Sequence, residues 1–127
     1  MKAIIDTHTY ICYINGDNRL SPKAFEIVDD RRNDIFISSA SIWELSIKIK
    51  LGKLKIISNF ENIEHDLRDL HISVLYIAMN DILQNYNLPF YHRDPFDRII
   101  ISQSLTKELP IIGCDELFDN YNVDRIW

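Results

Sequence analysis

Short apolar runs alternate with longer stretches of mixed polarity along the chain. Residues 2–5, 35–37, 72–76 and 110–112 are mostly apolar over the length of a buried strand, and residues 123–126 form a further candidate for an edge strand. Between these runs, turn residues and helix start signals bound stretches in which apolar positions recur with helical spacing. The pattern predicts helices over residues 10–14, 22–32, 41–52, 60–70, 80–86 and 95–109, with a short helical turn over 116–120.

This order of elements indicates an α/β fold. Because parallel strands need crossover connections, strands separated by helices predict a central, mostly parallel sheet of four or five strands. Helices should cover both faces of the sheet, which gives a three-layer α/β/α sandwich. The chain has 127 residues, 46% of them hydrophobic, which suits one core and leaves too little length for a second. We therefore expect a single domain over residues 1–127.

Composition indicates the cellular compartment of the protein and limits how it could bind nucleic acid. A net charge of −5 argues against attraction of nucleic acid by the whole molecule, so any such binding must be local. Four lysines lie between positions 48 and 55, although a solvated helix face also accounts for such a run. The two cysteines, Cys12 and Cys114, match neither a zinc spacing nor a disulfide framework. With no secretory leader and no apolar run of membrane-spanning length, these features predict a cytoplasmic, soluble protein with no place in a membrane.

Acidic residues follow several of the predicted strands and helix starts. Asp6 comes directly after the first strand, and Asp115 follows the fourth. Glu44 lies in the first turn of the helix after the second strand, while Asp94 and Asp97 begin the late helix. In open α/β sheets, ligands bind outside the carboxyl ends of the strands, where helix N-termini also point. We therefore expect these carboxylates to meet at one edge of the sheet.

Each of these acids also has a purely structural explanation, because Asp and Glu are favoured at helix N-caps and in first turns. Glu44 could complete a capping box with Ser41. Asp94 has the chemistry of a cap for the late helix, and Asp115 for the short turn that follows it. Asp6 is harder to explain in this way because it ends a core strand.

Taken together, the acids point to a metal ion. Several carboxylates at one edge repel one another, and a bound divalent cation relieves that repulsion. Oxygen ligands with no clustered Cys or His favour Mg²⁺ or Mn²⁺ over zinc. Since magnesium shares its coordination shell with substrate phosphates, the expected chemistry is attack of a metal-activated water on a phosphodiester.

Four segments of the chain resemble the PIN domain family, and especially the VapC-like toxins of toxin-antitoxin pairs. They are Ile-Ile-Asp-Thr-His at residues 4–8, Ser-Ser-Ala-Ser-Ile-Trp-Glu at 38–44 with Lys48 and residues 52–54, His-Arg-Asp-Pro-Phe-Asp-Arg at 92–98, and Cys-Asp-Glu-Leu-Phe at 114–118. They follow the family's order over nearly the whole chain. The resemblance implies cleavage of single-stranded RNA with Mg²⁺ or Mn²⁺, and it places the family's catalytic, metal-binding acids at Asp6, Glu44, Asp97 and Asp115.

The same resemblance implies further roles. Asp94 is an additional candidate ligand, and Thr7 is expected to steady a metal-bound water. Arg93, Arg98 and Lys48 are candidate contacts for RNA, although ordinary surface or ion-pairing roles are the favoured explanation of the two arginines. The family often has Thr or Ser two residues before the last acid, where this chain has Gly113. That departure raises the question of how Asp115 is held.

Partners are also implied by the resemblance. VapC-like proteins pair as homodimers and are inhibited by an antitoxin whose peptide fills or covers the acidic groove. The helix over residues 41–51 is apolar on more than one face, which suits burial on two sides. Core packing is the default explanation of that pattern, and a subunit interface is the alternative.

Other residues favour structural roles. The histidines, at positions 8, 65, 71 and 92, lack metal-ligand spacing and are expected at the surface or in local hydrogen bonds, with His8 and His92 as possible substrate contacts because they flank acidic segments. Cys114 has no histidine partner and is expected to be a small buried residue. The aromatic residues next to the motifs are expected in the core although they could stack on bases: Tyr10, Trp43, Phe96 and Phe118.

Two other functions remain open. An aspartyl phosphotransferase of the haloacid-dehalogenase type would place a nucleophile at Asp6, but its second Asp is replaced by His8. A non-catalytic module could keep the acids and act only by binding RNA or protein. The presence of all four acids argues against that alternative.

Overall fold

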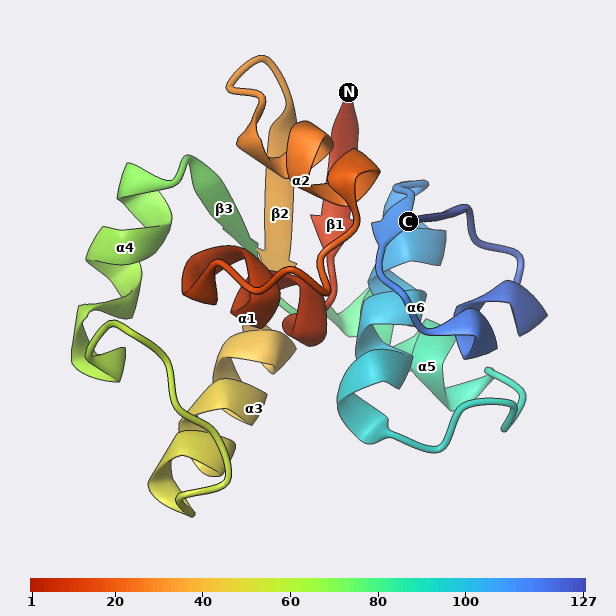
Figure 1. The fold of residues 1–127 in the computed structure, drawn as a ribbon. Helices are drawn as coiled ribbons and strands as arrows, with labels where there is room; N and C mark the ends of the chain where they lie inside the picture. The colour runs from red at the N-terminus through yellow and green to blue at the C-terminus, as the bar shows by residue number, and fades with distance from the viewer.

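The computed structural model describes residues 1–127. Strands and helices alternate along most of the chain (Figure 1). In chain order, the elements are β1 (Lys2–Ile5), α1 (Thr7–Asn15), α2 (Pro22–Asp29), β2 (Asp34–Ser38), α3 (Ser39–Lys50), the 3-10 helix η1 (Phe60–Asn62), α4 (Ile63–Asp69), β3 (Ile72–Leu75), α5 (Met79–Tyr86), α6 (Pro95–Lys107), β4 (Ile111–Ile112), the 3-10 helix η2 (Glu116–Asn120) and β5 (Arg125–Ile126).

The strands form one parallel sheet in the order β3-β2-β1-β4-β5. At its centre, Ile4 of β1 pairs with Phe36 of β2 on one side and with Ile111 of β4 on the other. The predicted parallel sheet is confirmed, and the run near the C-terminus is its fifth strand. In Figure 1, β1 and β2 both point towards α1 and α3, so their carboxyl ends share one edge.

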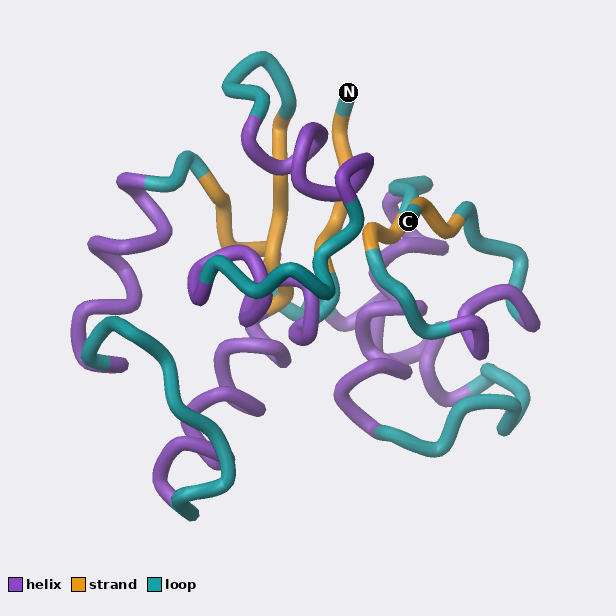
Figure 2. Tube along the Cα trace, in the orientation of Figure 1, coloured by secondary structure: helices purple, strands orange, loops and turns teal.

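Alternate strand residues enter two separate cores, because successive side chains of a strand point to opposite faces. Ala3 and Ile5 pack with apolar residues of α1, α2, α3 and α4. Ile4 packs on the other side, with residues of α6 and η2. Figure 2 shows helices on both sides of the strands. The three-layer α/β/α arrangement predicted from the sequence is therefore confirmed.

Two helices begin earlier than the sequence pattern predicted. Asp6 caps α1 by accepting a hydrogen bond from the Thr9 amide, so the helix starts at Thr7. Ser38 caps α3 through the Ala40 amide, so that helix starts at Ser39. The predicted capping box between Ser41 and Glu44 is therefore wrong.

The prediction that Trp43 lies in the core is also wrong. Its side chain is 63% exposed and meets the ring of Phe96 edge to face, with centroids 5.5 Å apart. Tyr10 and Phe118 are buried as predicted. None of the helices combines the length and the apolar character needed to cross a membrane.

Candidate metal centre

Strand order brings the acidic positions to one edge of the sheet. β1 lies between β2 and β4, so the carboxyl ends of these three parallel strands are neighbours. The order of strands reverses between β1 and β4, and ligand sites of open α/β sheets form at such reversals. Asp6 follows β1, Glu44 lies on α3 after β2, and Asp115 follows β4. Asp97 reaches this edge from the first turn of α6.

The carboxylate of Asp6 is buried against the backbone of the β4 end. Its Oδ1 accepts the Thr9 amide hydrogen bond at 2.8 Å, while Oδ2 lies over Gly113, where an added Cβ would approach it to 2.6 Å. Burial raises the pKa of Asp6, opposed by the hydrogen bonds from Thr9. The glycine that departs from the family pattern therefore leaves the space that the Asp6 carboxylate fills.

Glu44 offers one free oxygen. Its side chain is buried in the second turn of α3, one turn later than predicted. Oε2 accepts a hydrogen bond from Nζ of Lys48 at 2.7 Å, but Oε1 is buried without a partner. An unpartnered buried carboxylate oxygen is costly, and a bound cation or water would satisfy it.

Asp94 and Asp97 have different roles at the start of α6. Asp94 is the N-cap, and its Oδ1 accepts from the amides of Phe96 and Asp97 at 2.8 and 3.2 Å. The capping explanation of Asp94 is therefore confirmed. Burial and, after it, the negative charges of four neighbouring carboxylates together raise the pKa of Asp97 to about 8. These neighbours are Asp94, Asp6, Glu44 and Asp115.

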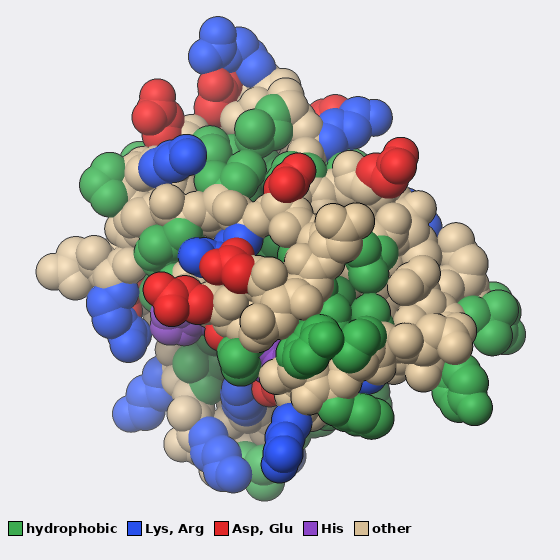
Figure 3. All heavy atoms as spheres, turned by 90° about the vertical axis from the view of Figure 1, so that its right-hand side faces the viewer, with side chains coloured by type: hydrophobic (Ala, Val, Ile, Leu, Met, Phe, Trp, Pro, Cys, Tyr) green, Lys and Arg blue, Asp and Glu red, His purple; other side chains and the backbone are tan.

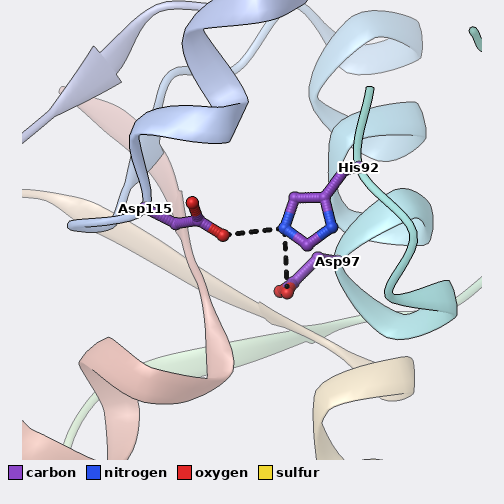
Figure 4. Close-up of side chains that lie close together, drawn as sticks. All are labelled: His92, Asp97 and Asp115. Atoms are coloured by element: carbon purple, nitrogen blue, oxygen red, sulfur yellow. Dashed lines mark hydrogen bonds and ion pairs between the residues drawn. The ribbon is translucent and has the colours of Figure 1, made fainter. Parts of the chain in front are cut away.

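His92 bridges two of the acids, although the sequence placed it only beside them. The ring is buried, and its Nε2 lies 2.7 Å from Oδ2 of Asp115 and 3.3 Å from Oδ2 of Asp97. Figure 4 shows the imidazole pointing between the two carboxylates. Asp115 is also the cap of η2, since its Oδ1 accepts from the Leu117 amide. The sequence signal was position alone, two residues before Asp94.

The predicted RNA contacts occupy different environments. Arg98 is buried, and its guanidinium donates to the carbonyl oxygens of Pro89 and His92 at 2.9 and 3.1 Å and stacks over Phe90. This placement corrects the expectation that Arg98 approaches RNA, because its donors are used inside the protein. Arg93 is exposed.

Thr7 and Lys48 are both engaged within the protein. The Thr7 hydroxyl donates to the Ser41 hydroxyl at 2.9 Å, which ties α1 to α3 and uses the proton that could have steadied a water. Lys48 pairs with Glu44 and has a half-exposed side chain. The hydrogen bond with Glu44 raises the pKa of Lys48.

The cluster has the composition of a site for a hard divalent cation. Its charged members supply carboxylate oxygens, which Mg²⁺ and Mn²⁺ prefer. One ligand atom from each of His92, Asp97 and Asp115 lies within 4.8 Å of the others. The free oxygen of Glu44 and the high pKa of Asp97 both indicate negative charge that the protein alone leaves uncompensated.

The fold and this cluster define an α/β protein with an acid-rich site at the carboxyl edge of its sheet. The family model for the PIN domain matches residues 3–123. The chain therefore belongs to the PIN domain family, whose members are generally metal-dependent nucleases.

Solved structures of toxin-antitoxin proteins share the fold over nearly the whole length of the matched chain. VapBC2 from Rickettsia felis, bound to a promoter DNA fragment, has a TM-score of 0.70 and 16% identity, covering 99% of this chain and 98% of that one. A toxin-antitoxin complex from Klebsiella pneumoniae has a TM-score of 0.67 and 15% identity, covering 98% and 96%. FitAcB from Neisseria gonorrhoeae has a TM-score of 0.63 and 16% identity, covering 100% and 97%. A comparison with curated proteins found no significant match.

Proposed function

We propose that this protein is a Mg²⁺- or Mn²⁺-dependent endoribonuclease that cleaves single-stranded RNA and acts as the toxin of a toxin-antitoxin pair. The observation that carries the proposal is the meeting of carboxylates from four separated segments around Asp97, whose pKa their charges help to raise. Helix capping alone would not require carboxylates from separate segments to lie close together. Membership of the PIN domain family supports the same chemistry.

The residues would divide the work of hydrolysis. Asp6, Asp97 and Asp115 would hold the cation, with Asp94 as a further carboxylate close by. When bound, the cation supplies positive charge that activates a water and stabilises the charge developing on the phosphate. The free Oε1 of Glu44 would join the same site and orient the attacking water.

Local positive charge would hold the RNA backbone. The net charge is −5, so a strand must be guided by a few cations near the acids. Arg93 precedes α6 and is exposed, while Lys48 lies beside Glu44. On the face seen in Figure 3, Lys and Arg side chains gather at the lower end, the height at which α3 lies in Figure 1. RNA affinity that does not fall after Arg93→Gln would count against this path.

An antitoxin segment would bind on a helical face of the protein. A hollow of about 660 Å³ lies between α1, α2 and α4, and it combines apolar and aromatic walls with three carboxylates. Tyr13 and Phe25 are among its walls, and the acids are Asp29, Asp66 and Asp69. A peptide with apolar and basic side chains would match this lining. Equal binding of the partner to a Phe25→Glu variant would contradict this placement.

A homodimer would cover the exposed face of α5. Four large apolar side chains recur there with helical spacing and are exposed: Met79, Ile82, Leu83 and Tyr86. Contiguous exposed apolar patches can mark interaction surfaces. A monomeric mass in sedimentation would contradict the proposal. We propose that the assembly acts in the cytoplasm, where PIN domain toxins are typically found.

The decisive experiment is cleavage of labelled single-stranded RNA by the purified protein. Cleavage should require Mg²⁺ or Mn²⁺, stop with EDTA, and disappear in Asp6→Asn and Asp97→Asn, while both variants stay folded. Asp124→Asn is the matched control, because Asp124 is exposed and is not one of the carboxylates whose charges raise the pKa of Asp97. Metal-independent cleavage, or RNA binding with no cleavage once any antitoxin is removed, would refute the proposal, and the second result would favour a non-catalytic binding module.

A further inference from the structure

His92 joins two acids that come from different parts of the fold. Asp97 belongs to the first turn of α6, while Asp115 follows β4. Both of their Oδ2 atoms lie close to the same ring nitrogen, Nε2, at 3.3 and 2.7 Å. The imidazole is therefore the contact through which these two carboxylates are held relative to each other (Figure 4).

The position of the His92 ring is fixed on several sides. Its backbone amide donates to the hydroxyl of Tyr121 at 2.8 Å, and its carbonyl accepts from Nη1 of Arg98 at 3.1 Å. The ring stacks on the ring of Phe118, with centroids 5.7 Å apart and an angle of 28° between the ring planes. A side chain with these restraints cannot turn freely, so it can impose a position on its neighbours.

Hydrogen bonding also fixes which nitrogen carries the proton. The Asp94 amide donates to Nδ1 at 3.2 Å, so Nδ1 must accept with its lone pair. In an imidazole with one N–H, that leaves the proton on Nε2, directed at the carboxylates. A nitrogen that bears a proton has no lone pair for a metal ion, so Nε2 acts as a donor to Asp115 and not as a ligand.

We propose that His92 is the positioning residue of the metal centre: its Nε2–H orients the Asp115 and Asp97 carboxylates, and Asp94 keeps the ring in the tautomer that can do so. This inference rests on the proposed function, since it assumes that both carboxylates bind a cation. The proposal gives Asp94 a role beyond capping, because the Asp94 backbone amide donates to Nδ1 and so favours the tautomer with the proton on Nε2. Hydrogen-bonding partners of metal-binding carboxylates commonly change metal affinity by about 10- to 100-fold when they are removed.

The first test is nitrogen NMR of the wild-type protein labelled in its histidines. We expect His92 to show a protonated Nε2 and an unprotonated Nδ1, both without metal and with saturating Mg²⁺. Loss of the Nε2 proton on addition of Mg²⁺ would make His92 a direct ligand and would overturn the proposal. This readout uses no substitution, so it stands even where a variant fails to fold.

The second test compares Mn²⁺ affinity by calorimetry for the wild type and three variants. His92→Leu should bind Mn²⁺ about 10- to 100-fold more weakly. His92→Gln should recover much of that loss, because its amide can still donate near the position of Nε2. His65→Leu is the matched control, since His65 pairs with Asp69 at 3.2 Å on the surface, and it should bind as the wild type does.

The outcomes distinguish a failure of the proposed function from a failure of the positioning role of His92. A wild type that neither binds Mn²⁺ nor cleaves RNA would remove the proposed function, and the role of His92 with it. A wild type that binds and cleaves, together with unchanged affinity in His92→Leu, would overturn the positioning role alone. Equal losses in His92→Gln and His92→Leu would also contradict it, because a donor would then have no effect.

Discussion

Replacing Asp97 by Asn should change how the stability of the metal-free protein depends on pH. In the folded protein the pKa of Asp97 is raised from 3.8 to about 8, first by burial and then by neighbouring negative charges. In the unfolded chain the same carboxyl ionises at its ordinary value, so folding takes up a proton between these limits. The contribution of Asp97 to stability is therefore complete below about pH 4 and is lost as the pH rises through about 8.

The size of the effect follows from the same pKa values. The difference between 3.8 and about 8, at about 1.4 kcal/mol per pKa unit, sets an upper limit of about 6 kcal/mol. The Asp97 side chain is still 21% exposed, and neighbouring carboxyl groups can take up the proton in its place. We therefore expect the wild type to lose about 2–3 kcal/mol relative to Asp97→Asn between about pH 5 and about pH 9.

Urea unfolding in EDTA at several pH values and constant ionic strength measures this difference. Asp124→Asn is the control, because it removes an exposed carboxylate outside the cluster. Its unfolding free energy should run parallel to that of the wild type. If the Asp97→Asn curve also runs parallel to the wild type over this range, the acids are not coupled in the folded protein and the electrostatic argument for the metal centre fails.

Two further substitutions test the packing around the acids. Gly113→Ala should lower the free energy of unfolding by about 1–3 kcal/mol and weaken Mn²⁺ binding, because the new methyl group would lie 2.6 Å from Oδ2 of Asp6. The loss of stability, measured by urea unfolding, should be smaller in an Asp6→Ser background. An equal loss in both backgrounds would contradict the steric cause. Lys48→Gln should lower metal-free stability by about 1–2 kcal/mol, since it leaves the buried Glu44 carboxylate without its partner. Added Mn²⁺ should recover most of that loss in thermal unfolding, and no recovery would place Glu44 outside the metal centre.

The sequence predicted the fold and the meeting of the acids because both follow from rules that act along the chain. Apolar runs of strand length separated by helices imply a parallel sheet, and acids after strand ends then share an edge. Asp6, Glu44, Asp97 and Asp115 were placed together on that ground, and in the structure the charges of the other three help to raise the pKa of Asp97.

What the sequence did not predict depends on packing between segments. The burial of Arg98 requires four carbonyl oxygens, from residues 85–92, to turn towards it. The bridge made by His92 requires the loop before α6 to lie against the end of β4. The space over Gly113 is visible only once Asp6 has a side-chain conformation. No pattern of spacing contains these relations, since each depends on the conformation of loops and side chains in the folded protein.

Capping and metal binding, which the sequence presented as alternatives, are compatible in the same side chain. A carboxylate has two oxygens, and in Asp6 and Asp115 Oδ1 accepts the capping hydrogen bond while Oδ2 is left for other contacts. The capping hydrogen bond to Oδ1 fixes the orientation of the carboxylate, and this orientation determines the direction in which Oδ2 points. An amide keeps the capping oxygen and loses only the charge. Asp6→Asn should therefore preserve α1 and the fold while it abolishes cation binding, whereas Asp6→Ala should lose both the cation and about 1 kcal/mol of stability.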